Sequence, residues 1–167
     1  MRSIFLLLFI IIFVGKAYTQ VSTSANINVR VNVVEPIKIT KSVDLDFGNV
    51  IGSFTTGTLT LDPDGIRTVN GVQISNAVPG DVTAAEAIVT HNNNNYSISL
   101  PESFTLFNSE NPDQFLLINQ FTVQPLPNAG DEGSDILKIG ATLNLEANQL
   151  PGFYTNSTGF NVTVSYN

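Results

Sequence analysis

The last residues of the chain alternate strictly between apolar and polar side chains. Phe160, Val162, Val164 and Tyr166 are separated by single polar residues, and the pattern holds up to Asn167. Because successive side chains on a β-strand point to opposite faces, this pattern gives one apolar and one polar face. An apolar face on a free tail would lie in water, so the segment must dock in a sheet. The sequence therefore predicts a fold that is closed by its own C-terminal strand.

The same alternation occurs near the other end of the chain. Between Ala25 and Val33, apolar residues at odd positions alternate with Asn and Arg. This pattern predicts a first strand, which Pro36 interrupts because proline lacks the N–H that a ladder needs. We therefore expect both ends of the mature chain to be strands. The spacing leaves open whether the N-terminal one is an ordinary first strand or a free donor arm.

Turn signals divide the middle of the chain into short strands. Asp62-Pro63-Asp64-Gly65 has the residue preferences of a type I turn, and Asn70-Gly71 is typical of a tight hairpin, so we expect a meander through Ile74. His91 and the asparagines up to Asn95 predict another hairpin tip, because asparagine tolerates left-handed backbone. A polar loop is expected over Pro125–Asp135. No stretch combines helical spacing with capping signals.

These signals predict an all-β fold. About nine to ten short strands with regular turns favour an antiparallel immunoglobulin-like (pilin-like) β-sandwich. The chain has no cysteine, so its core must hold it together without disulfides. Residues 20–167 are long enough for one domain that buries nearly 70% of its unfolded surface. We expect a single domain there.

The first residues have the order of a secretory signal. A cation at Arg2 is followed by an apolar run from Ile4 to Val14 and then by small residues. A membrane span needs about 20 apolar residues, and this run is roughly half as long. We expect a signal peptide over residues 1–19, cleaved between Ala17 and Gln20, with no membrane span afterwards. The mature protein would be secreted, periplasmic or on the outer cell surface, and a retained anchor is the alternative.

Charge excludes some classes of partner. From residue 20 onward, five Lys or Arg face fourteen Asp or Glu, a net charge near −9. A chain this acidic is not attracted to nucleic acid or to anionic lipid. We expect no nucleic-acid partner.

No catalytic residue, cofactor-binding residue or metal ligand is assigned from the sequence. His91 is the only histidine, so a triad or zinc site lacks partners, and we interpret it as a surface residue. The pairs Asp44/Asp46 and Asp62/Asp64 could supply the two carboxylates of a glycosidase, but turn chemistry and a solvated strand face explain them better. An enzyme is not expected.

One acidic loop leaves a question open. Asp131, Glu132 and Asp135 lie among glycines and could offer oxygen ligands to calcium. Their spacing does not match the calcium-loop motif, so a plain acidic loop is favoured. No cofactor is expected.

Five motifs in order carry a resemblance to a known family. They are LDFG at 45–48, GTLTLDPDG at 57–65, NYSISLP at 95–101, LKIGATL at 137–143, and GFY with the closing strand. The chain resembles, over almost its whole mature length, the bacterial secreted family known as domain of unknown function 4402. That family has no established activity, so the resemblance implies fold and location. The last strand alone is similar to subunits of chaperone–usher pili and to spore coat U type domains, which also end in an alternating strand with an upstream glycine, here Gly152, and an aromatic residue next to last, here Tyr166. Pilins usually carry a disulfide, and this chain has no cysteine.

These observations lead to two functional expectations. The first is a non-enzymatic secreted or cell-surface structural protein, such as a fimbria-like subunit or surface-layer component, which joins other copies of itself or surface proteins by strand addition. The alternative is an extracellular carbohydrate- or ligand-binding module that uses the loops Asn92–Asn95 and Asp131–Asp135.

Overall fold

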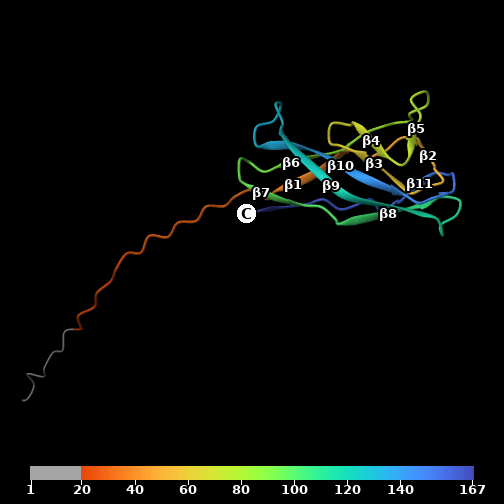
Figure 1. Cartoon of the computed structure of the whole chain (residues 1–167). Helices are drawn as coiled ribbons and strands as arrows, with labels where there is room; N and C mark the ends of the chain where they lie inside the picture. Colours follow the sequence, from red (N-terminus) through yellow and green to blue (C-terminus); the bar gives the residue numbers. More distant parts are fainter. Residues whose placement is uncertain (1–19) are drawn as a thin grey trace, which may run out of the picture. The chain divides into compact units, whose positions relative to one another are not determined.

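The computed structural model describes residues 20–167. The predicted signal peptide and its cleavage site lie outside these residues, apart from Gln20. By its internal contacts the chain divides after Val33, and Val34–Asn167 forms one compact unit. Figure 1 shows this unit with its strands coloured by their position in the sequence.

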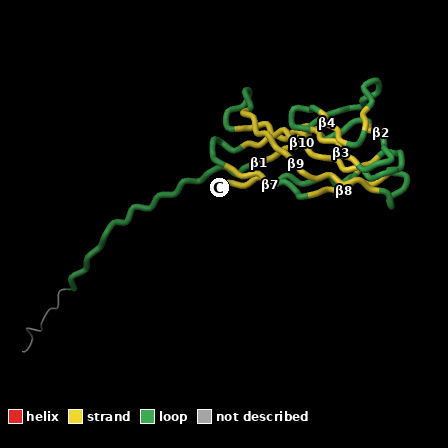
Figure 2. The backbone as a smooth tube through the Cα atoms, in the orientation of Figure 1, coloured by secondary structure: helices red, strands yellow, loops and turns green. Residues whose placement is uncertain are grey.

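The described residues contain twelve β-strands and no helix (Figure 2). Every pairing between strands is antiparallel, so the predicted all-β antiparallel class is confirmed. The number exceeds nine or ten because three strands are only two residues long. The strands are β1 (Lys38–Val43), β2 (Val50–Ile51), β3 (Gly57–Leu61), β4 (Arg67–Asn70), β5 (Gln73–Ile74), β6 (Ala85–Thr90), β7 (Tyr96–Ser99), β8 (Ser103–Asn108), β9 (Phe115–Pro127), β10 (Ser134–Leu145), β11 (Tyr154–Thr155) and β12 (Thr163–Tyr166).

Most strands belong to one curled sheet in the form of a half-barrel, with the order β1-β6-β10-β9-β8-β11. The long strand β10 lies at its centre between β9 on one side and, on the other, β6 along its first half and β3 along its second. Strand β4 pairs with the outer edge of β3. Figure 1 shows β6, β10 and β9 side by side across this sheet.

A bulge in β9, opposite Gly140 and Ala141 of β10, bends the centre of the sheet. The β9–β10 register shifts between Gly140 and Thr142, and Gln120 on β9 has a positive φ of 49°. A Cβ at Gly140 would collide with the backbone oxygen of Leu61. Only glycine lets the end of β3 approach β10 so closely at this point.

Strands β7 and β12 form a separate two-stranded sheet. The apolar residues Phe160, Val162 and Val164 pack on the core, whereas Thr163 and Ser165 are exposed. The predicted closing strand and its two faces are therefore confirmed, although ladder pairing begins at Thr163.

The last part of the chain runs antiparallel beside β7 and β8 in one continuous register. Tyr154 faces Asn108 on β8, and Thr163 faces Ser99 on β7, so both strands advance by nine residues between these two pairs. Residues 154–166 thus run beside residues 96–108 as one antiparallel ribbon with an irregular middle.

Two apolar clusters make up the core. The first is centred on Leu59, Leu61 and Leu143 between β3, β9 and β10. The second contains only four buried residues, namely Ala85, Val89, Leu137 and Ile139. Eleven half-buried apolar residues surround the second cluster, compared with eight around the nine buried residues of the first. The core that β7 and β12 cover is therefore the less completely enclosed of the two.

The predicted N-terminal strand is not formed. Residues 25–33 make no ladder in the described structure, and Ile27, Val29 and Val31 are 84%, 88% and 85% exposed. An alternating pattern gives a strand two faces, but it does not supply a neighbouring strand to pair with.

The predicted pairing of the third meander strand is also wrong. The hairpin at Asp62–Gly65 is confirmed, with the Gly65 N–H donating to the Asp62 carbonyl at 3.0 Å. After Gly71, however, β5 pairs with β2 and not with β4. The buried side chain of Val72 enters the first core cluster at this point, and this packing directs the chain away from β4.

The predicted hairpin at His91–Asn95 is wrong as well, because β6 pairs with β1 and β10 while β7 pairs with β12. The loop carries the chain from one sheet to the other. Its expected left-handed backbone is confirmed at Asn92 and Asn93, with φ values of 47° and 62°.

The loop predicted for Pro125–Asp135 is shorter than expected, since β9 continues to Pro127 and β10 starts at Ser134. Beyond Asn119, β9 has β10 as its only ladder partner, and proline is tolerated on such an edge.

Candidate functional site

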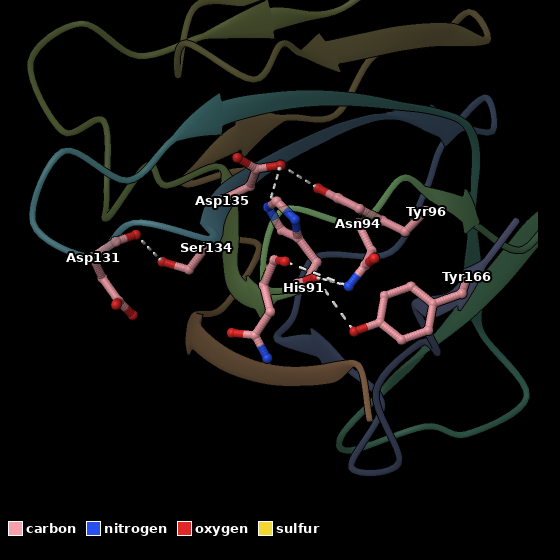
Figure 3. Close-up of polar contacts among 8 residues, drawn as sticks. His91, Asn94, Tyr96, Asp131, Ser134, Asp135 and Tyr166 are labelled. Atoms are coloured by element: carbon pink, nitrogen blue, oxygen red, sulfur yellow. Dashed lines mark hydrogen bonds and ion pairs between the residues drawn. The ribbon is translucent and has the colours of Figure 1, made fainter. Parts of the chain in front are cut away.

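Three side chains from three segments meet at one end of the compact unit. His91 directly follows β6, Tyr96 begins β7, and Asp135 is the second residue of β10. The Tyr96 hydroxyl donates to Asp135 Oδ2 at 2.7 Å, and His91 Nε2 lies 3.4 Å from the same oxygen. The His91 and Tyr96 rings are tilted by 33°, with centroids 5.0 Å apart. Figure 3 shows Asp135 facing both rings.

Backbone hydrogen bonds bring the two contributing loops together. The N–H groups of His91 and Asn92 both donate to the Gly133 carbonyl, at 2.8 and 3.0 Å. Gly133 has a φ of +81°, and a Cβ there would lie 3.0 Å from Asn92 Cα. A glycine is needed at this contact because the backbone is left-handed and the loops touch.

Burial and the Asp135 carboxylate keep the Tyr96 hydroxyl protonated. Desolvation is the main cause that raises its pKa, and the hydrogen bond to Asp135 and the charge of that carboxylate add to it. Tyr96 is therefore a fixed donor across the physiological range.

His91 is not the surface residue that the sequence predicted. Its side chain is only 13% exposed, and that of Asp135 only 19%. Neither ring nitrogen makes a well-aligned hydrogen bond to another protein group in the described structure, although Nε2 is close to Asp135. The partners of His91 come from β7 and β10, and no local sequence signal places them beside it.

A shallow, open hollow of about 440 Å³ lies over this cluster. Its walls carry amides, a phenol, an imidazole and a carboxylate, from His91, Asn93, Asn94, Asn95, Tyr96, Asp135 and Asn167. Such a surface presents several hydrogen-bond donors and acceptors together. The two loops suggested from sequence as a ligand-binding region, Asn92–Asn95 and Asp131–Asp135, thus do meet at their His91 and Asp135 ends.

The hydroxyl of Ser134 is not arranged as a nucleophile for His91. Its Oγ donates to the Asp131 carbonyl at 2.9 Å, and the residue is buried (Figure 3). A serine nucleophile needs a base within hydrogen-bond reach. The arrangement holds the loop and does not resemble a catalytic triad.

The paired carboxylates have structural roles. Asp62 Oδ1 accepts the N–H groups of Asp64 and Ile66 at 3.0 and 2.8 Å, which stabilises the turn as expected. Asp44 forms an exposed ion pair with Lys41, and Asp46 accepts the Gly48 N–H.

The acidic loop does not gather its carboxylates. Asp131 and Glu132 are exposed, while Asp135 faces His91 and Tyr96. Among residues 20–167 no group of three or more His, Cys, Asp or Glu side chains is placed to hold a metal ion. The calcium site thus has no assembled ligand set in this part of the chain.

A second set of contacts fixes the start of the compact unit. The Tyr166 hydroxyl donates to the Glu35 carbonyl at 3.0 Å and lies 3.4 Å from the His91 carbonyl. Asn92 Nδ2 donates to Glu35 Oε2 at 2.6 Å. The end of β12 is thereby held beside the residues that precede β1.

Among residues 20–167, no helix is long and apolar enough to cross a membrane.

A family model matches most of the chain. The profile of a family described as a domain of unknown function, DUF4402, matches residues 37–166. Searches of the curated proteins and of the solved structures found no match. The resemblance to this family is therefore confirmed, and the distant likeness to pilins and spore coat U type domains stays a prediction.

Proposed function

The chain belongs to the DUF4402 family, whose description names no activity, and from its own geometry we propose that it is a secreted or cell-surface structural subunit. Copies join when one donates its N-terminal segment, residues 25–33, as a β-strand to the next. We call these residues the donor segment.

The exposed alternation of the donor segment carries this proposal. Val29 and Val31 are 88% and 85% exposed, and the intervening polar residues include only one charge, at Arg30. An extended segment that adds to a sheet edge gains main-chain hydrogen bonds, and its alternate side chains enter the partner's apolar surface. The donor segment has the pattern for both.

A simple tether would need a different composition. Spacers that hold a domain away from a membrane are rich in Gly, Ser or Pro, which stay soluble without a partner. The donor segment instead alternates Ile and Val with Asn, a composition that favours strands at its apolar positions. Contiguous exposed apolar side chains of this kind mark interaction surfaces.

An immunoglobulin-like sandwich, as expected from the sequence, is part of the same proposal. Sheet β7–β12 packs on the second core cluster opposite β6 and β10, as two layers of an immunoglobulin-like sandwich would. This arrangement would be completed by one further strand from another copy.

The test compares charge substitutions at equally exposed sites. The full chain, secreted from a bacterial host, should form polymers visible by electron microscopy and size-exclusion chromatography. Val29→Asp combined with Val31→Asp should reduce the polymer fraction at least about tenfold, because two charges cannot be buried without partners. Phe54→Asp is the control, since Phe54 is 90% exposed but lies outside the donor segment.

Two results would contradict the proposal. One is a wild-type chain that stays monomeric at about 100 μM, a concentration at which even a weak specific contact is populated. The other is an equal loss of polymer in Phe54→Asp and in the Val29/Val31 variant, which would indicate general apolar association.

The hollow beside His91 favours a second candidate function, an extracellular carbohydrate- or ligand-binding module. Side-chain amides and a carboxylate are the groups that hydrogen-bond to sugar hydroxyls. The supporting observation is that loops distant in sequence meet there through the Gly133 carbonyl.

A glycan array tests this second candidate. Binding by the wild-type chain that is lost in Asp135→Asn and kept in Asp64→Asn, an exposed turn residue outside the hollow, would support it. Equal binding by both variants would place any glycan contact elsewhere.

A further inference from the structure

We infer that the acceptor for the donor segment is the free edge of residues 154–166 in a second copy of this chain. This inference rests on the proposed function and adds the identity of the receiving strand. It follows from a comparison of the open strand edges in the described structure.

Two long edges are protected against pairing. Strand β1 carries Lys38 and Lys41 and has a register break before Val43. The outer half of β9 carries Pro125 and Pro127. Lysines, bulges and prolines are the devices that keep sheet edges from pairing with other chains.

Two shorter edges are poor acceptors for other reasons. At the start of β4, Arg67 reaches across to the Phe47 carbonyl at 3.1 Å, which holds a neighbouring loop against that edge. Strand β7 ends shortly before Pro101, and β2 and β5 pair with each other over only two residues, so none of them belongs to a long edge in one register as residues 154–166 do. None of these matches a donor segment of nine residues.

The last segment has none of these protections. Residues 154–166 contain no charged side chain and no proline, and their only ladder partners are β7 and β8 on one side. Phe160, Asn161 and Val162 make no backbone hydrogen bond within residues 20–167. Beneath them lies the less completely enclosed core cluster, where Phe160, Val162 and Val164 are only half-buried.

The donor segment and this edge match in length, pattern and charge. Nine residues extend about 30 Å as a strand, shorter than the thirteen residues of the edge. Both alternate apolar and uncharged polar residues, with Arg30 as the exception. The compact unit, residues 34–167, has four Lys or Arg against fourteen Asp or Glu, so a segment whose one charge is positive is attracted to it.

Single cysteines can locate the contact, because the chain has no cysteine of its own. One variant carries Thr163→Cys on the outer face of β12. The second variant carries one cysteine on the polar face of the donor segment, in place of Asn26, Asn28 or Asn32 in turn. Facing residues on neighbouring strands have Cβ atoms about 5 Å apart, within reach of a disulfide.

The two full-length chains are co-expressed with tags of different size, and non-reducing gels detect the mixed disulfide. Thr68→Cys on β4, which is also exposed, is the matched control.

The expected result is a mixed disulfide between Thr163→Cys and at least one donor position, at least about tenfold more abundant than with Thr68→Cys. Polymers that form no mixed disulfide through Thr163, or form it equally through Thr68, would overturn the β12 assignment and leave strand donation standing. A monomeric chain with both cysteines that closes on itself would place the segment on its own β12 and also overturn the inference. Absence of polymers would overturn the proposed function, and the inference with it.

Discussion

The two ends of the described chain share one sequence pattern but differ in structure. Residues 163–166 pair with β7, and Phe160, Val162 and Val164 pack on the core. Residues 25–33 have the same alternation, yet Ile27, Val29 and Val31 are exposed and unpaired. Alternation therefore specifies the two faces of a strand without specifying its neighbour. We propose that the N-terminal segment, which has no ladder partner among residues 20–167, finds one in another copy.

Deletions of the two ends should differ most strongly in their effect on stability. Removal of residues 159–167 should prevent stable folding, since it strips β12 from the second core cluster and exposes the edge of β7. Removal of residues 20–33 should shift the melting temperature of the compact unit by less than about 2 °C. Thermal melts of the secreted proteins measure both. Comparable losses from the two deletions would show that the N-terminal residues also stabilise the compact unit.

The same substitution at the two ends gives a finer comparison. Val164→Asp places an unpaired charge against the core and should cost about 2 to 4 kcal/mol. Val31→Asp, at an exposed position, should stay within about 0.5 kcal/mol in a monomeric background. Thr163→Asp, on the exposed face of β12, serves as the face control and should also be mild. Urea unfolding curves measure all three, and equal costs at Thr163 and Val164 would mean that both faces of β12 are buried.

The smallest predicted effect on stability concerns the cluster of His91, Tyr96 and Asp135. Tyr96→Phe removes the hydrogen bond to Asp135 and should cost about 1 kcal/mol. Because the Tyr96 pKa in the folded protein is raised above its ordinary value of 10.0, the stabilisation is complete below pH 10 and is lost as the pH rises further. Stability measured from pH 8 to 11 should fall less steeply in Tyr96→Phe than in the wild type. Tyr166→Phe is the control, since its hydroxyl donates to backbone carbonyls; an identical change in slope for both variants would contradict the role of Asp135.

The sequence predicted those parts of the fold that depend on local chemistry. The faces of the closing strand, the turn at Asp62–Gly65 and the left-handed asparagines 92 and 93 are all present. Each of these follows from side-chain periodicity or from the backbone preferences of a few adjacent residues.

Pairing partners were predicted less well, because they depend on packing between distant residues. Strand β5 leaves the meander because Val72 enters the core, and β7 pairs not with β6 but with β12, whose paired residues lie 64 to 70 positions further along the chain. The candidate site was missed for the same reason. His91 has no neighbour in sequence that predicts Asp135 or Tyr96 beside it, and the signal that could have been used is Gly133, a glycine in the loop that contacts Asn92. The expectations of secretion, a non-enzymatic role and single-domain organisation over residues 20–167 stay predictions.

Amide hydrogen exchange of residues 25–33 tests most directly whether this segment finds its neighbour in another copy. In the dissociated chain the amides of this segment should exchange at nearly the rate of an unstructured peptide, because no ladder protects them. In the assembled protein their exchange should slow by at least about 100-fold, together with that of Phe160, Asn161 and Val162. Rapid exchange of residues 25–33 in both states would contradict strand donation.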